Sequence, residues 1–310
     1  MPKFAFVFPG QGSQAVGMLN GFADNQVVRD TFVEASDALG FDLWQMIADG
    51  HKESLDLTTN TQPVMLTSSV AMYRAWIAAG GKAPAIVAGH SLGEFSALVA
   101  IGVIGLKEAV KLVRFRAEAM QEAVPVGMGG MAAILGLSDE DVTAACAEAA
   151  QGQIVEPVNF NAPSQLVIAG HKDAVARACE IAKAKGAKRA LILSVSAPFH
   201  SSLLKPASDR LRDYMTKLTF ASPQIPLINN VDVAIVSDPD AIKDALVRQA
   251  ASPVRWVETI NKMAAEGVTQ VIECGPGRVL AGLSKRINDG LTGDAITDQA
   301  SLDKVLEVLK

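Results

Sequence analysis

The chain has 310 residues, of which 49% are hydrophobic, and a formal net charge of −5. This composition provides a sizeable core, in one large domain or in a domain that carries a smaller one. The negative charge argues against nucleic acid or an anionic membrane as the main partner. The three cysteines, Cys146, Cys179 and Cys274, lie far apart, which suits a reducing compartment and excludes a disulfide framework or a cysteine-based zinc site.

We expect a cytoplasmic protein without a membrane segment. The apolar run at residues 4–8 is too short for the core of a signal peptide, and no suitable cleavage site follows it. The longest apolar stretch, residues 95–106, falls well short of the roughly 20 residues that a membrane-spanning helix needs.

The first predicted strand covers residues 4–8, which are apolar throughout, as in a strand covered on both faces. The loop that follows matches the glycine pattern of dinucleotide-binding proteins from Gly10 to Ala15, and Asp30 lies about 20 residues further on. In that motif Asp30 would end a second strand. The apolar residues around it instead recur at helical spacing, at Val28, Phe32, Ala35 and Leu39. We therefore reject a dinucleotide site and expect no cofactor.

The stretch from Pro84 to Phe95 has the sequence of a nucleophile elbow. Its first five residues predict a buried strand, and a helix is predicted from Leu92 onward. Between them lies Gly89-x-Ser91-x-Gly93, where the tight turn requires glycine on both sides of the serine. Such a turn exposes the serine hydroxyl and directs the next amide at an oxygen bonded to the carbon under attack. A chance match in a loop of small residues is the alternative, but the position between a strand and a helix favours the functional interpretation.

Helices are predicted on both sides of the elbow, at residues 61–79 and 106–124. In the second helix Arg116 lies on the apolar face, which is formed by Ala109, Leu112, Val113, Ala117 and Met120. Arg114 falls on the opposite, charged face. An arginine directed into the protein needs a partner, which could be a ligand or a structural ion pair.

Residues 127–198 predict an inserted small domain. Strands and helices alternate in the order strand-helix-strand-strand-helix-strand, at residues 131–137, 139–150, 155–160, 165–169, 173–185 and 190–195. This is the order of the ferredoxin-like unit. The flanking residues, 1–126 and 199–310, would form one large α/β domain. Strands near Phe6, Val87, Leu227 and Ile272 could form its mostly parallel sheet, with functional residues at their carboxyl ends.

The four histidines differ in their suitability as a catalytic base. His200 follows the last strand of the insertion and is the best candidate to take the proton of Ser91. His90 adjoins that serine, where ring geometry makes it a poor base, and it is better suited to shape the turn. His51 lies in a charged loop, and His171 ends a strand of the small domain. No acid is an evident partner for His200, so a backbone carbonyl could hold its imidazole.

Short motifs recur along essentially the whole chain: residues 8–14, 61–63, 89–94, Arg116, 159–161, 198–200, 229–231, Gln249 and 275–277. In this order and spacing they resemble those of the malonyl-CoA:acyl carrier protein transacylases. The resemblance implies a hydrolase-like core with a ferredoxin-like insertion, in agreement with the pattern of elements above.

The resemblance also implies how the reaction centre is built. Ser91 would be the nucleophile that is acylated, and His200 its general base and then acid. The amides of Gln11 and Leu92 would form the oxyanion hole. The main-chain carbonyl of Gln249 would orient the histidine, which would explain the missing acid.

Further residues would select the substrate. Arg116 would bind the free carboxylate of the malonyl group, with Gln62 nearby. Asn161 would help to place His200 and would line the pocket. Phe199, which is serine in some relatives, is usual in malonyl-selective acyltransferases and favours an unbranched substrate.

The implied reaction is a ping-pong transfer from malonyl-CoA to the phosphopantetheine thiol of holo acyl carrier protein, in fatty-acid or polyketide synthesis. Carrier proteins of this class are acidic, so docking on a chain of net negative charge would need a local basic patch. Four cations at the end of the second helix of the insertion form a candidate patch: Lys183, Lys185, Lys188 and Arg189. A solvated helix end is the alternative.

A serine hydrolase or thioesterase that acts on acyl-CoA or acyl carrier protein is the main alternative function. The elbow and the histidine fit it equally well, but an inward arginine and a histidine without an acid do not. A non-catalytic docking module that keeps the fold is a second alternative, and the presence of Ser91, His200 and Arg116 argues against it.

Overall fold

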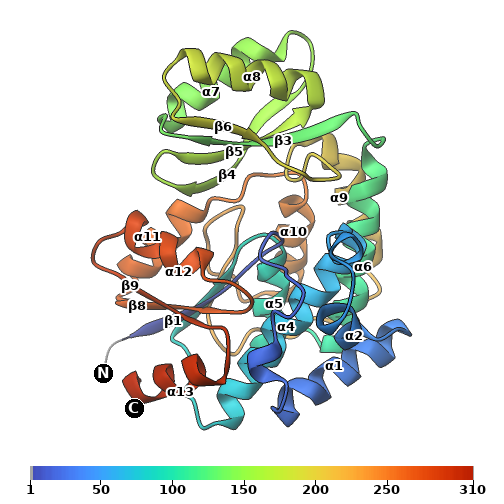
Figure 1. Ribbon diagram of the computed structural model, residues 1–310, viewed down its shortest axis with the longest axis vertical. Coiled ribbons are helices and arrows are strands. Elements are labelled where there is room, and N and C mark those ends of the chain that lie inside the picture. Colours follow the sequence, from blue (N-terminus) through green and yellow to red (C-terminus); the bar gives the residue numbers. More distant parts are fainter. Residues whose placement is uncertain (1–2, 310) are drawn as a thin grey trace.

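Two β-sheets organise the protein in the computed structural model, which describes residues 3–309 (Figure 1). The larger sheet has five strands in the order β7-β2-β1-β8-β9, and all neighbours are parallel. Its strands are β1 (Phe4–Phe8), β2 (Ile86–Gly89), β7 (Leu227–Ile228), β8 (Gln270–Cys274) and β9 (Thr292–Ile296). Phe8 at the end of β1 pairs with Gly89 at the end of β2, so the loops that follow these two strands lie side by side.

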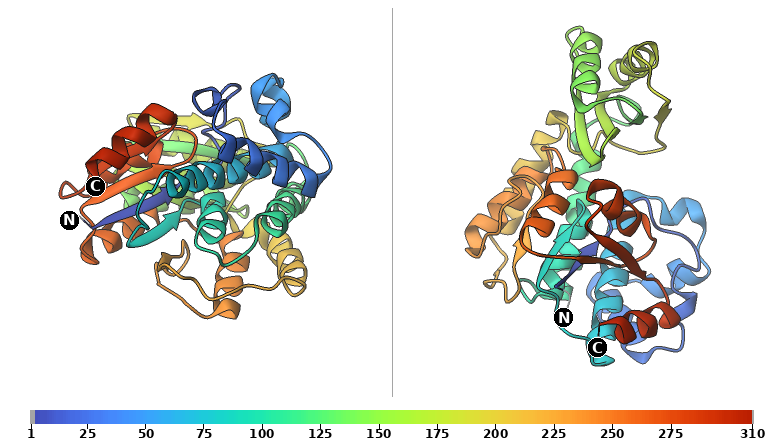
Figure 2. Two further views of the ribbon diagram at one scale, coloured as in Figure 1. Left: turned by 90° about the horizontal axis from the view of Figure 1, so that it is seen from below. Right: turned by 90° about the vertical axis from the view of Figure 1, so that its left-hand side faces the viewer.

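The central strand β1 explains why helices cover both faces of this sheet. Phe4, Phe6 and Phe8 enter one hydrophobic core, whereas Ala5 and Val7 enter another. The phenylalanine face packs on α1 (Gln26–Leu39), α4 (Thr58–Ala78), α5 (Leu92–Ala100) and α6 (Leu106–Ala123), and the other on α11 (Trp256–Ala265) and α12 (Val279–Ile287). Figure 2 shows helices on both sides of the sheet.

The remaining helices of this unit complete its cover. They are α2 (Leu43–Ala48), α3 (Lys52–Leu55), α9 (Lys205–Met215), α10 (Pro239–Gln249) and α13 (Gln299–Val308), with short 3₁₀ helices η1 (Asn20–Phe22) and η2 (Ser202–Leu204). None of the helices within residues 3–309 is both long and apolar enough to cross a bilayer.

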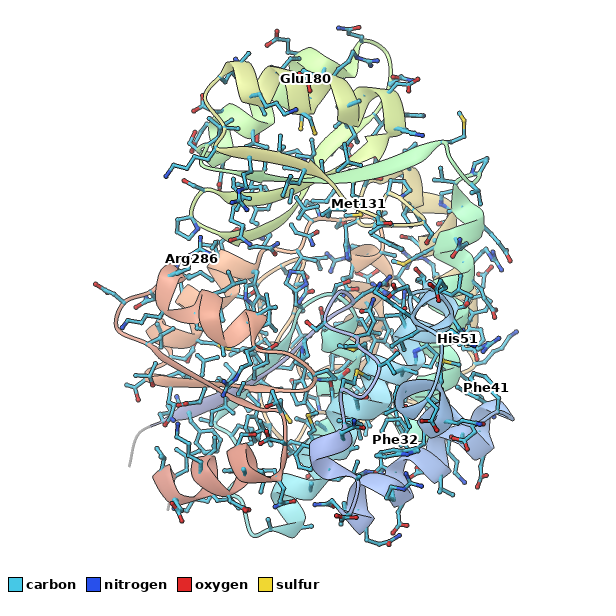
Figure 3. The ribbon with its side chains drawn as sticks, in the orientation of Figure 1. Phe32, Phe41, His51, Met131, Glu180 and Arg286 are labelled. Carbon is cyan, nitrogen blue, oxygen red and sulfur yellow. The ribbon has the colours of Figure 1, made fainter. Side chains whose placement is uncertain are left out.

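The smaller sheet is antiparallel, with the order β4-β5-β3-β6. It comprises β3 (Gly129–Leu135), β4 (Val155–Ala162), β5 (Gln165–His171) and β6 (Arg189–Ile192), and it is joined by α7 (Asp139–Ala150) and α8 (Lys172–Ala184). These two helices pack on one face of the sheet (Figure 1). The opposite face presents Met131 toward the larger unit (Figure 3). Val167 lies in the same hydrophobic cluster, and Phe199 packs against this cluster. The amide of Phe160 in β4 also donates to the carbonyl of Val254, at 3.0 Å, and so links the two units.

The predicted α/β fold with a parallel sheet, flanking helices and an inserted small sheet is confirmed, including the strand-helix-strand-strand-helix-strand order of the insertion. Two elements near the C-terminus, β9 and α13, were not predicted. The first predicted helix by the elbow begins earlier than expected, at Thr58, which places Gln62 in its second turn. The boundaries at residues 127 and 198 stay a prediction, although all four antiparallel strands lie between them.

The elbow between β2 and α5 depends on close backbone approach. Ser91 has φ 52° and ψ −109°, a conformation that few non-glycine residues adopt. A Cβ atom on Gly89 would lie 1.8 Å from the carbonyl carbon of Gly93, and one on Gly93 would lie 2.0 Å from the carbonyl oxygen of Phe8. Neither backbone can yield without moving the strand or the helix, so both glycines are required by packing.

We expect Gly89→Ala to destabilise the protein. The added methyl group meets backbone atoms rather than a flexible side chain, and overpacking of this kind costs roughly 1–3 kcal/mol. The midpoint of thermal unfolding should fall by about 2–5 °C, measured by differential scanning calorimetry. Gly282→Ala is the matched control, because a Cβ atom added there would have no atom within 4 Å. Equal midpoints for the two variants would contradict this account of the elbow.

Candidate active site

Ser91 opens onto a cavity of about 890 Å³ between the two units. The cavity is lined by the loops after β1 and β2, by β4, β5 and α12, and by the segment that returns the chain from the small sheet, including Ser196, Phe199 and His200. The carboxyl ends of β1 and β2 thus form one side of the cavity, as predicted for a parallel sheet of this kind. The small sheet forms the opposite side, where the largely buried side chains of Met131 and Val167 line the cavity.

His200 is placed to take the proton of the serine. Its Nε2 lies 2.6 Å from Ser91 Oγ, and its Nδ1 lies 2.8 Å from the main-chain oxygen of Gln249. A carbonyl oxygen can only accept, so Nδ1 carries the hydrogen and Nε2 is left with a lone pair for the serine proton. The predicted contact between the histidine and the Gln249 carbonyl is therefore present, and no acid is needed to set the tautomer.

The surroundings of His200 keep its imidazole neutral. Burial lowers its pKa to about 3, and the neighbouring Arg116 cation acts in the same direction. The side chain is almost fully buried, and the residue has φ 67°. The ring is thus an unprotonated acceptor throughout the neutral range, which is the state that a general base requires.

Arg116 is buried beside the nucleophile, only 2% exposed. Its guanidinium donates to Gln62 Oε1 and to Gln249 Oε1, each at 2.9 Å, and to Ser91 Oγ at 3.2 Å. Within residues 3–309 no carboxylate forms an ion pair with it. The guanidinium therefore makes no direct ion pair in this part of the chain. Burial lowers the pKa of Arg116 to about 10, whereas the nearby charge of Glu94, which acts on it across the Gln249 amide, raises the pKa. Arg116 thus remains a cation at neutral pH.

Two amides near the serine have the character of an oxyanion hole. Gln11 and Leu92 both line the cavity, and Leu92 is the first residue of α5, where the helix itself supplies no acceptor. No acceptor in the described part of the chain takes a hydrogen bond from either amide. Two unused donors thus flank the nucleophile, one in the loop after β1 and one at the start of α5.

The prediction for Asn161 is corrected. Its Oδ1 lies 2.8 Å from Nε2 of His90, not of His200, although it does line the cavity. The ring of His90 packs against Trp256, with 5.4 Å between the ring centroids, and it is half-buried at the wall of the cavity, as expected of a residue that shapes the turn. Asn161 therefore holds the elbow from the side of β4. Phe199 is half-buried and lines the cavity, as predicted.

Two functional residues were missed although their motifs were noted. Asn230 Oδ1 accepts from the amide of Ser91, and its Nδ2 donates to the carbonyl of Gly89, both at 2.7 Å. Glu94, in the first turn of α5, accepts from the side chain of Gln249 at 2.8 Å. Their only signal in the sequence is a polar residue where a strand ends or a buried helix begins.

The predicted basic patch is partly neutralised by acids. Lys183 pairs with Glu180 at 2.8 Å, and Lys185 lies 3.8 Å from Glu148. Figure 3 places Glu180 in the helical layer farthest from the parallel sheet. Docking of a carrier protein at this helix end stays a prediction.

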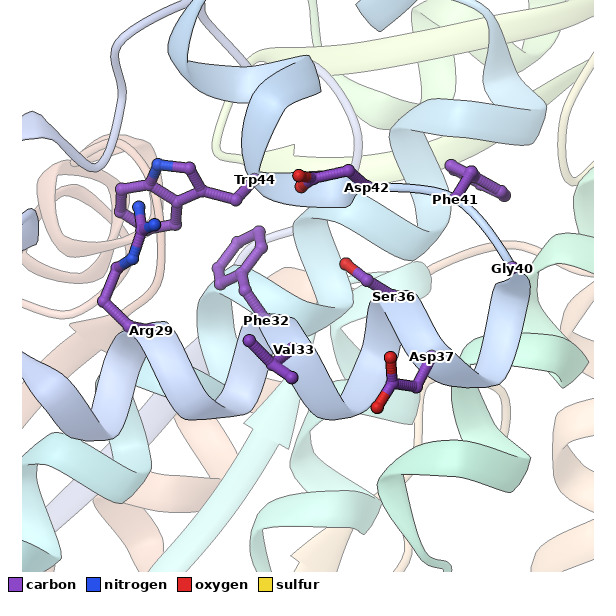
Figure 4. A pocket seen from close by; sticks show the side chains of 9 residues that line it. All are labelled: Arg29, Phe32, Val33, Ser36, Asp37, Gly40, Phe41, Asp42 and Trp44. Atoms are coloured by element: carbon purple, nitrogen blue, oxygen red, sulfur yellow. The ribbon is translucent and has the colours of Figure 1, made fainter.

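A second hollow, of about 660 Å³, lies between α1 and α2 (Figure 4). Three of its polar groups are engaged within the protein: the Arg29 guanidinium stacks 4.0 Å from the ring centroid of Trp44, Ser36 accepts from an amide, and Asp42 caps α2. The remaining acid, Asp37, is exposed to solvent. We assign no ligand to this hollow. Among residues 3–309, no group of three His, Cys, Asp or Glu side chains could hold a metal ion.

The neutral state of His200 predicts how the reactivity of Ser91 depends on pH. Because the pKa of His200 in the folded protein is about 3, its imidazole stays unprotonated as the pH falls from 8 to 5. The rate of modification by a fluorophosphonate probe, followed by intact-mass spectrometry, should change less than about threefold over this range. If the base were a histidine with an ordinary pKa of about 6.5, the rate of modification would instead fall about 30-fold by pH 5, because the imidazole would be protonated. That larger loss would contradict the assignment, and His200→Ala supplies the baseline rate.

Comparison with known proteins agrees with this geometry. The family model described as "Acyl transferase domain" matches residues 5–296. Malonyl CoA-acyl carrier protein transacylase of Escherichia coli (strain K12) is 56% identical over 309 residues, which cover 99% of this chain and 100% of the relative. The corresponding protein of Bacillus subtilis (strain 168) is 44% identical, with 100% and 98% covered.

Solved structures agree as well. Acyl-carrier-protein S-malonyltransferase from Burkholderia pseudomallei 1710b is 67% identical, with a TM-score of 0.97 over 98% of this chain and 99% of that chain. A malonyl-transacylase in complex with its type II PKS acyl-carrier protein is 54% identical, with a TM-score of 0.98 over 99% of both chains. On a family match over nearly its whole length and on identities of this size, the chain belongs to the malonyl CoA-acyl carrier protein transacylases.

Proposed function

We propose that this protein transfers the malonyl group of malonyl-CoA to the phosphopantetheine thiol of acyl carrier protein through an ester on Ser91. One observation carries the proposal: the Arg116 guanidinium donates to Ser91 Oγ at 3.2 Å, and all of its hydrogen-bond partners within residues 3–309 are neutral. A buried cation beside a nucleophile favours an acyl group with a free carboxylate. The relatives named above support the same substrates.

In the first half-reaction, Ser91 Oγ attacks the thioester carbonyl of malonyl-CoA while its proton passes to His200 Nε2, 2.6 Å away. The negative charge that develops on the carbonyl oxygen is stabilised by the amides of Gln11 and Leu92. The carbon–sulfur bond then breaks, and the CoA thiolate leaves with the proton from the imidazolium. The products are the malonyl-serine ester and CoA.

In the second half-reaction, the carrier thiol gives its proton to His200 and attacks the ester carbonyl. The carbon–oxygen bond to Ser91 breaks, and the serine recovers its proton from the imidazolium. CoA and the carrier's phosphopantetheine arm reach the same hydroxyl through one cavity, so the first must leave before the second enters. Every proton is carried by the histidine, and the proposal includes no cofactor.

Selection of the acyl group rests on Arg116. The planar guanidinium can donate two parallel hydrogen bonds to one carboxylate, which lysine cannot reproduce. The carbonyl oxygens of Gln62 and Gln249 hold it by its two terminal nitrogens. An acetyl group would leave this cation without a partner, and such sites can reject the lesser substrate by as much as about 10⁴-fold.

A serine hydrolase is the alternative that shares the elbow and the histidine. The buried cation and the carbonyl partner of His200 favour the transferase. We further propose that the protein acts in the cytoplasm in fatty-acid or polyketide synthesis, which is supported by the named relatives and by the complex with a type II PKS carrier protein.

Ser91→Ala should abolish the mass added to the protein by malonyl-CoA, as measured by intact-mass spectrometry. Ser96→Ala is the matched control, because Ser96 lies in α5, which begins directly after Ser91, and its buried hydroxyl has no partner in the described chain. Wild-type protein mixed with malonyl-CoA alone should hold the ester and release little malonate. Rapid release of malonate over many turnovers would show a hydrolase, and label on the Ser91 variant would refute the nucleophile.

Arg116→Ala should lower the rate of malonyl loading by about 10³-fold or more, while acetyl loading holds or rises. The carboxylate loses its cation, whereas the smaller acetyl group no longer faces an unpaired charge. Arg116→Lys should recover only part of the loss. Arg114→Ala, on the exposed side of the same helix, is the control and should leave both rates nearly unchanged. Equal losses for both acyl groups would show that Arg116 is only structural.

A further inference from the structure

Glu94 is a buried acid that the proposed mechanism does not use. It lies in the first turn of α5, three residues after the nucleophile, and is 1% exposed. A carboxylate in such a position needs hydrogen-bond donors, because burial without them is costly. Its donors come from two other parts of the site.

Both donors reach the same oxygen of the carboxylate. Glu94 Oε2 accepts from Gln249 Nε2 at 2.8 Å and from the main-chain amide of Asn230 at 3.1 Å. Gln249 Nε2 also donates to the main-chain oxygen of Ser91 at 3.0 Å. The amino group of the Gln249 side chain is thus held by two acceptors, and its orientation follows from them.

The orientation of this amide decides what faces Arg116. With its amino group toward Glu94, Gln249 presents its Oε1 to the guanidinium at 2.9 Å. The opposite orientation would place an N–H donor against a cation and lose this hydrogen bond. The same guanidinium nitrogen donates to Ser91 Oγ, so its position over the nucleophile depends on the Gln249 carbonyl.

We propose that Glu94 is a positioning residue for malonyl selection: it fixes the Gln249 amide so that its side-chain carbonyl holds the Arg116 guanidinium beside Ser91. This inference rests on the proposed function. His200 is bonded to the main-chain carbonyl of Gln249, which does not turn with the side-chain amide. Loss of the Glu94 contact therefore affects recognition of the carboxylate more than proton transfer.

The accepting oxygen of Glu94 is what fixes the Gln249 amide, and the charge of Glu94 acts separately on Arg116, whose pKa burial lowers and this charge raises. Burial raises the pKa of Glu94 to about 7, and Oε2 can accept in either state. A glutamine can offer its carbonyl oxygen at the same point to both donors. Glu94→Gln therefore serves as the conservative variant, and Glu94→Met removes the acceptor at similar length.

The test compares rates of Ser91 loading from malonyl-CoA and from acetyl-CoA by intact-mass spectrometry. Glu94→Met should lower the malonyl-to-acetyl ratio by about 10- to 100-fold, the range of a hydrogen bond to a charged group, with acetyl loading changed less than about threefold. Glu94→Gln should keep the ratio within about fivefold of the wild type. Glu273→Met is the matched control: it also removes a buried carboxylate of raised pKa, but from β8, and should leave the ratio unchanged.

A double-mutant cycle tests the route through Gln249. Gln249→Met keeps the main-chain carbonyl and removes the amide, so Glu94→Met in that background should lower the ratio no further. The inference would be overturned if the effects of the two substitutions on the malonyl-to-acetyl ratio multiplied in the double variant. It would also be overturned if Glu94→Met lowered malonyl and acetyl loading equally. If Glu94→Met does not fold, Glu94→Asp is the substitute, because it draws the accepting oxygen back by one methylene group. It should still lower the malonyl-to-acetyl ratio, and an unchanged ratio would overturn the inference as well. Failure of the proposed function would give a different result from failure of this inference, because the wild-type protein itself would then load malonyl no faster than acetyl.

Discussion

A cation without an acidic partner, buried next to a nucleophile, is the constraint on which this site depends. Arg116 is held by the side-chain carbonyls of Gln62 and Gln249, so its charge is positioned by hydrogen bonds but not neutralised by an ion pair. Desolvation lowers its pKa only to about 10, and the guanidinium stays charged at neutral pH. A carboxylate that enters the cavity can form a direct ion pair with the Arg116 guanidinium, which no side chain in the described part of the protein does. An uncharged acyl group cannot form this ion pair.

The backbone around Ser91 positions the oxyanion donors relative to the nucleophile. Pairing of β1 with β2 brings the loop of Gln11 beside the elbow, and the contact between Gly89 and Gly93 lets α5 begin directly under Ser91. Asn230, after β7, fixes the elbow through the amide of the serine. The two oxyanion donors and the base thus come from three separate stretches: Gln11 follows β1, Leu92 follows β2, and His200 lies on the segment that returns from the small sheet. The first two meet because parallel strands end at one edge of the sheet.

Much of this site could be predicted because its chemistry is local in the sequence. The elbow pattern marks Ser91, and helical spacing places Arg116 on the buried face of α6. The role of Glu94 could not be predicted, because it depends on which way a side-chain amide turns in the folded protein. Asn161 was given the wrong histidine for a similar reason: two histidines line the same cavity as Asn161, and only the packing of the folded protein decides which one it contacts. For the fold, β9 was missed because its sequence, Thr-Gly-Asp-Ala-Ile, lacks the apolar run of a buried strand.

The central claim is that Arg116 receives the far carboxylate of the acyl group while Ser91 holds the near end. The most direct measurement is a crystal structure of the malonyl-serine intermediate, trapped before any carrier protein is added. Our account predicts that both terminal nitrogens of the guanidinium donate to the malonyl carboxylate, with the ester carbonyl oxygen directed at the amides of Gln11 and Leu92. A carboxylate that points into solvent, with the guanidinium still bonded only to protein atoms, would contradict it.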